Sequence, residues 1–159
     1  MTGQISDSFL YKGKTYAITG YTGGELFSPL DFGLFPKPAT TACWRGFVLY
    51  FTVLDDYLTL VDMEINAEDA LEINGVKPHI REETFRLHYQ DLNLKINYTG
   101  KIRIATDFIK SMYVHMGFQR SIAYETVIEL KFQDGALISE KDLSQKMKKK
   151  RKTNPNEGS

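Results

Sequence analysis

The sequence predicts a mostly β, β-rich α+β fold: an antiparallel sheet built from hairpins, closed into a barrel or folded into a sandwich, with one C-terminal helix. Three observations indicate it. Several short stretches alternate apolar and polar residues, as strands with one buried face do. Turn sequences such as Asp134-Gly135 join neighbouring stretches directly, which favours hairpins over crossover helices. The clearest helical pattern comes near the end of the chain, after Ser139.

The first 41 residues predict a small hairpin followed by a long loop. Strand-like runs at residues 9–11 and 15–18 flank Gly13. Residues 27–41 contain three prolines, each of which disfavours a helix at the preceding residue. The same loop carries five Phe and Leu side chains, too many to leave in water. We expect it to lie across the sheet as a lid.

The central stretch, residues 46–65, predicts one long hairpin. Residues 47–54 are apolar on both faces, so we expect this strand to be covered on both sides or to lie centrally in the sheet. Residues 57–65 then run back. Asp55-Asp56 lacks the glycine of the best two-residue turns, which predicts a loop longer than two residues.

The middle of the chain is less regular. Residues 68–72 favour one helical turn, and residues 84–89 favour a strand. Residues 92–98 and 102–104 alternate in polarity and predict another hairpin with one wet face. Residues 107–113 fit either a short helix or a continuing strand.

The last hairpin is predicted from residues 124–132 and 136–139, joined by a strong turn signal. Ser139 is then the expected cap of a helix, with Asp142 in the capping-box position. That helix should fray into residues 148–152, and residues 153–159 should be disordered.

Length and charge indicate one domain with a distinct tail. A chain of 159 residues is expected to form a single domain, here residues 1–145. The formal net charge of zero hides an asymmetry, because residues 1–145 carry −5 and residues 146–159 carry +5. Residues 146–159 therefore read as a basic, disordered C-terminal tail.

The chain has features of a cytoplasmic protein. Its one cysteine cannot form an internal disulfide, which fits a reducing compartment. The first residues lack the basic and apolar regions of a secretory signal. No apolar run approaches the roughly 20 residues that a membrane helix needs. We therefore expect a cytoplasmic location and no membrane span.

Candidate binding residues stand at the start of the central hairpin. Arg45 offers a planar guanidinium suited to a carboxylate or other anion, and Trp44 beside it offers a stacking surface. Equally, Arg45 can pair with an internal carboxylate while Trp44 covers one end of the core. Cys43 would need a nearby base to act as a nucleophile, and it can also be a small buried apolar side chain.

A second candidate segment contains His115 and Arg120, five residues apart around Gly117. The two side chains could line a binding site, or they could lie at the end of a strand and hydrogen-bond to nearby backbone. The three histidines match no metal-ligand spacing, so we expect no metal site and no cofactor. Residues 20–24 are rich in glycine but lack the ending of a phosphate loop.

Three functions remain open from the sequence. The first is a non-catalytic protein-binding module of inhibitor or immunity type, favoured by the acidic body and the nine tyrosines, a residue type enriched in interfaces. The second is a small-ligand-binding barrel in which Trp44, Arg45 and His115 converge beneath the lid and Arg45 holds a small anionic ligand. The third is a hydrolase-like enzyme that uses Cys43 with His115, or His115 with an acid such as Asp107 or Glu125.

The sequence disfavours nucleic acid as the main partner. The basic run Lys146–Lys152 would attract phosphates, but no aromatic side chain lies near it in sequence to stack on bases. We expect such binding to be weak at most and confined to this run.

Overall fold

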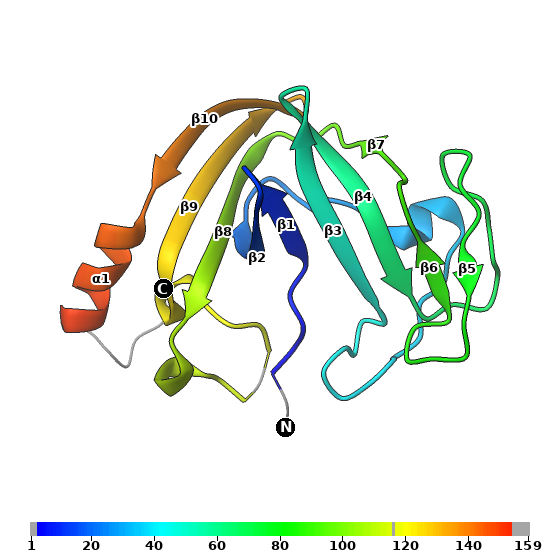
Figure 1. Ribbon diagram of the computed structural model, residues 1–159, viewed down its shortest axis with the longest axis horizontal. Coiled ribbons are helices and arrows are strands. Elements are labelled where there is room, and N and C mark those ends of the chain that lie inside the picture. Colours follow the sequence, from blue (N-terminus) through cyan, green and yellow to red (C-terminus); the bar gives the residue numbers. More distant parts are fainter. Residues whose placement is uncertain (1–2, 116, 154–159) are drawn as a thin grey trace.

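A computed structural model of the chain describes residues 3–115 and 117–153 (Figure 1). The strands are β1 (Ser8–Tyr11), β2 (Lys14–Tyr21), β3 (Phe47–Leu54), β4 (Tyr57–Ile65), β5 (His79–Ile80), β6 (Leu87–Tyr89), β7 (Leu94–Lys95), β8 (Gly100–Phe108), β9 (Tyr124–Gln133) and β10 (Ala136–Asp142). Three short 3-10 helices, η1 (Pro29–Phe32), η2 (Lys110–Met112) and η3 (Ser121–Ala123), lie in connections, and α1 (Ser144–Thr153) ends the described chain.

The strands form one sheet that bends round towards closure. Their order is β10-β9-β8-β2-β1-β3-β4-β6-β5, and β7 pairs with β4 beside this path. A bridge between Ala136 and Tyr57 also joins β10 to β4, which gives a ring-like arrangement. Figure 1 shows the result as an arch, with α1 beyond β9 and β10 on one side and β5 and β6 on the other. The β-rich prediction with one C-terminal helix is confirmed.

All strand pairs are antiparallel except one. β1 pairs with β3 in parallel, from Ser8 opposite Tyr50 to Leu10 opposite Thr52. β1 has β2 on its other side, so the first hairpin brings its leading strand against the central hairpin. The sheet is therefore mixed but mostly antiparallel.

Three hairpins of the described chain, with turns at residues 12–13, 55–56 and 134–135, use the same kind of two-residue turn. Leu54 pairs with Tyr57 across Asp55 and Asp56, whose φ angles are +51° and +61°. Positive φ at both central residues defines the turn whose twist matches that of the strands. The loop at residues 55–56 is thus two residues long, shorter than expected, because aspartate tolerates the left-handed region.

The turn between β9 and β10 is the predicted Asp134-Gly135, with φ of +49° and +88°. A Cβ on Gly135 would lie 2.3 Å from the ring of Tyr57. Glycine is therefore required here both by the backbone angle and by the close approach of β4.

The hairpin predicted for residues 92–104 does not form. β7 pairs instead with β4, with Thr59 opposite Lys95, whereas β8 pairs with β2 and β9. Alternating polarity identifies a strand and its buried face but not its partner. Residues 68–72 also form no helix; the nearby turn is a bridge between Ile73 and Val76.

The helix begins later than Ser139. β10 continues through Asp142, and the backbone N–H of Ser144 donates to the Asp142 carboxylate at 2.8 Å. α1 then runs through the basic residues that we expected to be disordered. Met147 is fully buried, and Arg151 Nη1 donates to the carbonyl oxygens of Ile122 and Tyr124, each at 2.8 Å. Residues 154–159 lie outside the described residues.

Large side chains fill the interior of the ring. The fully buried ones come from strands on every side; among them are Phe9, Phe51, Leu58, Leu60, Met63, Leu87, Tyr89 and Phe132. The long loop after β2 contributes Leu34, which is fully buried, and Phe27, which packs partly against the core. Phe35 is 67% exposed, and Leu30 and Phe32 are also exposed. The lid prediction is therefore correct only for part of the loop.

Within residues 3–115 and 117–153, no helix is both long and apolar enough to cross a membrane.

Candidate functional site

Three segments far apart in the sequence meet at one end of the molecule. The N-terminal segment, residues 3–5, lies between the loop at 40–46 and the loop at 113–119. The hydrogen bonds that join them run from Ile5 N to Ala42 O (2.8 Å), from Gln4 N to Gly117 O (2.6 Å) and from Gly3 N to Tyr113 Oη (2.9 Å). Both loops are therefore tied to the same short piece of chain.

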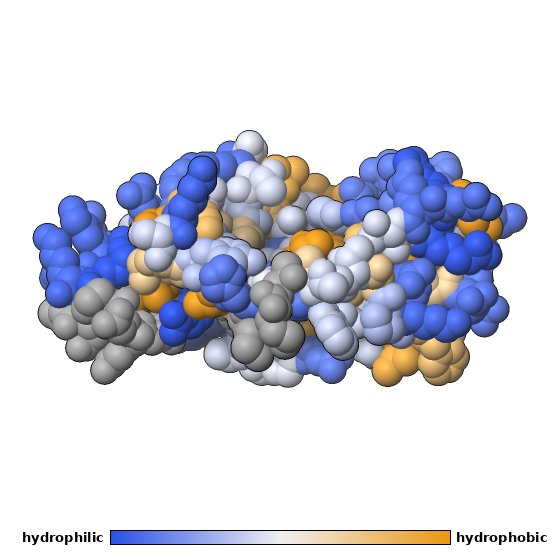
Figure 2. Space-filling model, turned by 90° about the horizontal axis from the view of Figure 1, so that it is seen from below, coloured by the Kyte–Doolittle hydropathy of each residue, from blue (hydrophilic) through white to orange (hydrophobic). Residues whose placement is uncertain are grey.

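Large apolar side chains remain in contact with solvent at this end. They are Ile5, Trp44, Tyr113 and Phe118, which we call the aromatic end. Trp44 is 61% exposed and Phe118 is 46% exposed. Figure 2 views the molecule from below, the side of the N-terminus in Figure 1, and shows apolar surface in the middle of a largely polar face.

The backbone of Trp44 is held in place although its ring is exposed. The Trp44 N–H donates to Gln4 Oε1 at 2.9 Å, and Gln4 Nε2 donates to the carbonyl oxygen of Thr41 at the same distance. One glutamine side chain thus spans the loop on both sides of Cys43. An exposed ring on a fixed backbone loses little freedom when it binds.

Arg45 connects the parts of the aromatic end through one ion pair and two contacts with aromatic rings. Its guanidinium forms two hydrogen bonds with the carboxylate of Asp7, one of them from Nη1 at 3.2 Å. The same guanidinium lies over the rings of Phe47 and Phe118, 4.6 and 5.5 Å from their centroids. Arg45 therefore pairs with an internal carboxylate, the simpler of its two expected roles, and also positions Phe118.

Asp7 is the partner that sequence inspection missed. Burial raises the pKa of Asp7, while the Arg45 guanidinium and the backbone N–H of Leu49, 2.8 Å from Oδ1, both act to lower it. No motif marked Asp7, because the residue stands 38 positions before Arg45 in the chain. Its role depends on the parallel pairing of β1 with β3, which alternating polarity does not reveal.

The loop at 113–119 is closed by its own side chain. Gln119 accepts a hydrogen bond from Val114 N–H and donates one to Val114 O, both at 2.9 Å. His115 is exposed, with its ring edge-on to Tyr113 at 4.8 Å. Arg120 is half-buried, and its Nε has no hydrogen-bond partner within the described residues.

The structure thus brings some of the predicted residues together and not others. Trp44 and Arg45 lie beside the segment that contains His115, linked through Gln4 and Phe118. No contact joins His115 to Arg45 among the described residues. Ile5, Tyr113 and Phe118 were missed, and only their apolar character beside loop residues could have indicated them.

Cys43 lies among core side chains. Cys43 is buried, its Sγ lies 3.5 Å from the carbonyl oxygen of Phe47, and it packs with Val48 and Phe85. These contacts are those of a small core side chain. The described residues also contain no group of three or more potential metal ligands.

Arg45 also lines a shallow pocket of about 230 Å³ under the loop that follows β2. Asp7 and Glu25 line the same pocket, but Trp44 and His115 do not. Of the three residues expected to converge beneath the lid, only Arg45 lines this pocket. Two carboxyl groups beside one guanidinium make this pocket a poor place for an anion.

The charge around the aromatic end is positive. Within residues 3–7, 40–46 and 110–120 the bases are Arg45, Lys110 and Arg120, and the one acid is Asp7, a net charge of +2. Asp7 is already paired, so the surplus lies with the cations at the rim.

Comparison of the chain with protein-family models, with curated proteins and with solved structures finds no significant match.

Proposed function

We propose that this protein is a non-catalytic binding module for another protein and that the aromatic end is its contact surface. The observation that carries the proposal is Trp44, whose ring is 61% exposed on a backbone fixed by Gln4 and beside an anchored Arg45. Tryptophan, tyrosine and arginine are enriched among the few residues that supply most of the binding energy in protein interfaces.

The surface favours one kind of partner. Ile5, Trp44 and Phe118 offer apolar area, and the surrounding net charge of +2 favours a carboxylate nearby. A protein segment that presents apolar side chains next to Asp or Glu meets both requirements. An inhibitor or immunity-type protein acts in this way, by occupying a surface of its target.

The other two functions have less support. Asp7 occupies the guanidinium of Arg45, which the small-ligand hypothesis needed for an anion. The buried contacts of Cys43 disfavour a nucleophile at that position. A cytoplasmic location, inferred from the single cysteine, remains part of the proposal.

The test is an affinity capture from the source lysate, read by mass spectrometry, with three versions of the full chain. The wild type should retain one protein in stoichiometric amount, and Trp44→Ala should lose it. Phe35→Ala is the matched control, because Phe35 is an equally exposed aromatic residue outside the aromatic end. Equal capture by all three versions, or no protein partner at all, would contradict the proposal.

Once the partner is purified, its binding can be followed through the fluorescence of Trp44. Trp44 is the only tryptophan in the chain, so its fluorescence reports on the aromatic end alone. On titration with the partner, and after subtraction of the partner's own fluorescence, the Trp44 emission should shift to shorter wavelength as the ring loses contact with water.

A further inference from the structure

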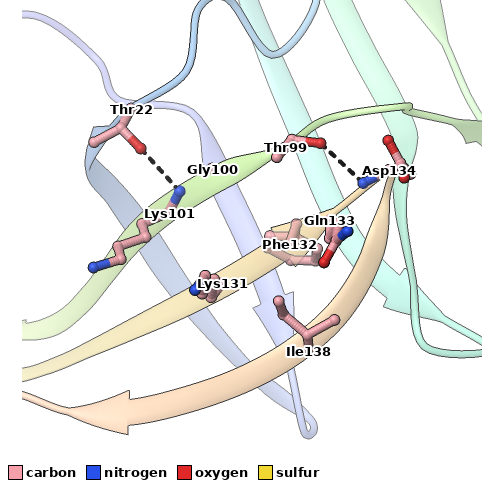
Figure 3. A pocket seen from close by; sticks show the side chains of 9 residues that line it. All are labelled: Thr22, Thr99, Gly100, Lys101, Lys131, Phe132, Gln133, Asp134 and Ile138. Atoms are coloured by element: carbon pink, nitrogen blue, oxygen red, sulfur yellow. Dashed lines mark hydrogen bonds between the residues drawn. The ribbon is translucent and has the colours of Figure 1, made fainter.

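A second candidate site lies on the outer face of the sheet, away from the aromatic end. A pocket of about 480 Å³ opens where the end of β2 meets β8, β9 and β10 (Figure 3). This volume falls in the range of small-molecule sites. The side chains in its lining that could contact a ligand are those of Lys101, Lys131, Thr22, Thr99 and Ile138.

Two lysines lie side by side on neighbouring strands in the lining of this pocket. Lys101 of β8 is directly opposite Lys131 of β9, and the next pair, Ile102 and Leu130, is fully buried on the other face. Both lysines therefore project outwards, from Cβ atoms roughly 4.5–5.5 Å apart. Like charges in this position destabilise a sheet, so their presence requires an explanation.

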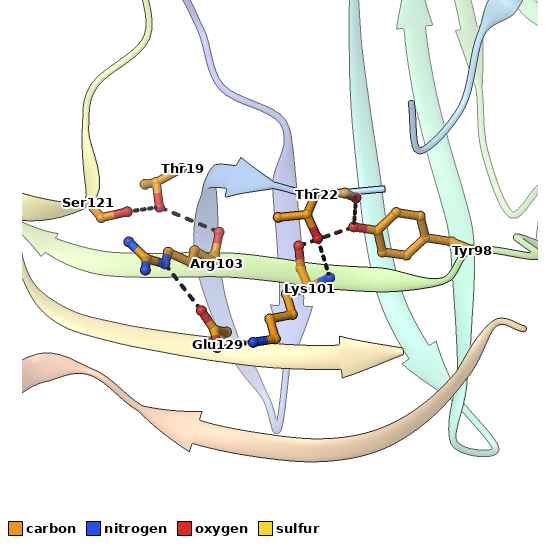
Figure 4. A network of polar contacts seen from close by, with 7 residues as sticks. All are labelled: Thr19, Thr22, Tyr98, Lys101, Arg103, Ser121 and Glu129. Carbon is orange, nitrogen blue, oxygen red and sulfur yellow. Dashed lines mark hydrogen bonds and ion pairs between the residues drawn. The ribbon is translucent and has the colours of Figure 1, made fainter. Parts of the chain in front are cut away.

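The neighbouring carboxylate neutralises only part of this charge. Glu129 lies 3.9 Å from Lys101 Nζ and 3.3 Å from Arg103 Nε (Figure 4). Lys131 forms no ion pair with any described residue. These four side chains carry a net charge of +2, which the carboxylate of Asp134, also in the pocket lining, reduces to +1; Lys131 is the pocket cation with no ion pair among the described residues.

Two hydroxyl groups at the pocket are also available as donors. Thr22 Oγ1 accepts a hydrogen bond from the Lys101 N–H at 3.0 Å, and Thr99 Oγ1 accepts one from the Asp134 N–H at 2.9 Å (Figure 3). Each hydroxyl thus uses a lone pair and keeps its proton. Among the described residues no hydrogen bond uses the Thr99 proton, whereas the Thr22 hydroxyl also lies in hydrogen-bond contact with Tyr98 and would have to turn from it towards a ligand.

The floor of the pocket is rigid. Tyr98 Oη donates to the carbonyl oxygens of Thr22 and Lys101, the latter at 3.1 Å (Figure 4). Gly100 has a φ of +153°, and a Cβ there would lie 2.6 Å from Tyr98 Oη and 2.7 Å from Thr22 O. The hydroxyls and the lysine backbone are therefore positioned before any ligand arrives.

The wider charge distribution favours an anion on this side. Residues 92–153 carry thirteen Lys and Arg against six Asp and Glu, a net charge of +7. Residues 55–91 carry three against ten, a net charge of −7. The acidic turn at Asp55 and Asp56 contacts β10 through Leu137, so the excess of positive charge that attracts anions lies along β8, β9 and α1 and not at the Asp134 end of the pocket.

We propose that this pocket binds a small molecule with a terminal phosphate, a phosphate monoester. Lys101, Lys131 and the two threonine hydroxyls would donate to the phosphate oxygens. Ile138, which is 49% exposed, would contact the apolar part of the molecule. This site is separate from the aromatic end, so either proposal can fail while the other stands.

The test is isothermal titration calorimetry of the full chain with inorganic phosphate, adenosine 5′-monophosphate and adenosine. Inorganic phosphate and the monophosphate should bind saturably at one site, and adenosine should not bind. The monophosphate should bind more tightly than inorganic phosphate, because its organic part adds contact with Ile138; equal affinity would contradict the monoester and leave free phosphate as the ligand.

Variants distinguish a built site from a diffuse basic surface. Lys131→Gln should weaken phosphate binding about tenfold, as expected for loss of one charged hydrogen bond. Lys148→Gln on α1 and Lys141→Gln on β10 remove equally exposed cations that do not line the pocket, and should change affinity less than twofold. Equal weakening by all three, or no saturable phosphate binding, would overturn the proposal.

Discussion

The guanidinium of Arg45 and the carboxylate of Asp7 join the start of β3 to the segment that precedes β1. Asp7 is largely buried and also accepts the Leu49 N–H, so the pair is fixed from two strands at once. The same guanidinium lies against Phe118, and the next residue back along the chain is Trp44. One partly buried ion pair therefore sets the geometry of the surface to which we assign partner binding.

Removal of one member of this pair should be costly. Asp7→Ala leaves Arg45 without its partner, and we expect a loss of about 3 kcal/mol in the free energy of unfolding, measured in urea. Lys37→Ala, which removes the exposed ion pair with Glu68, is the control and should cost less than about 1 kcal/mol. A loss for Asp7→Ala as small as that of the control would show that Arg45 does not anchor this end.

Met147 should hold α1 to the sheet. It is fully buried and packs with Val127 and Leu143, so Met147→Ala should cost about 2–5 kcal/mol. Lys146→Ala, one residue earlier on the exposed side of α1, should have little effect. Thermal unfolding followed by circular dichroism compares the two; equal midpoints would mean that the helix contributes nothing to stability.

Replacement of Lys131 by glutamate should stabilise the sheet. Lys131→Glu changes a like-charge pair with Lys101 into an opposite-charge pair, worth about 0.2–1 kcal/mol across neighbouring strands. The same change should abolish phosphate binding. A rise in melting temperature with loss of binding is the expected combination, and a lower melting temperature would contradict the argument from register.

Alkaline pH should destabilise the protein through buried tyrosines. Burial raises the pKa of Tyr89 to about 12, and its hydroxyl donates to Leu71 O at 2.5 Å. A phenol with a raised pKa favours the folded state below its ordinary pKa of about 10, and this contribution is lost as the pH rises from about 10 to 12.

Burial also raises the pKa of Tyr11 and Tyr50, so several groups should add to the effect. Unfolding in urea at pH 8, 10 and 11.5 measures the loss of stability. Tyr89→Phe should start about 1 kcal/mol less stable, because it lacks the hydrogen bond to Leu71. It should then lose less stability between pH 10 and pH 11.5 than the wild type. An identical loss in both proteins would show that ionisation of Tyr89 does not cause the destabilisation.

The hairpins with strong local signals were predictable from the sequence. Residues 124–133 and 136–142 pair through Asp134-Gly135 because that turn and the alternation of polarity are both local properties. The partners of β7 and β8 were not predictable in this way. Lys95 lies opposite Thr59, and Ala105 lies opposite Ala17, contacts that depend on how the whole sheet closes.

In the candidate site, too, some residues were predictable from local sequence and others were not. Trp44 and Arg45 were identified from residue type and from their place before a buried strand. Asp7 and Phe118 were not, because they reach Arg45 only through long-range pairing and loop packing. The order of α1 was also missed, since its docking depends on Met147 and on backbone acceptors of η3 and β9.

The central claim, that a protein partner binds the aromatic end, is tested most directly by hydrogen–deuterium exchange of the full chain alone and in complex with the captured partner. The account predicts slower exchange on binding in residues 40–46 and 113–119, with little change in β5, β6 and α1. Protection confined to β5 and β6 or to α1, with the loops unchanged, would contradict it.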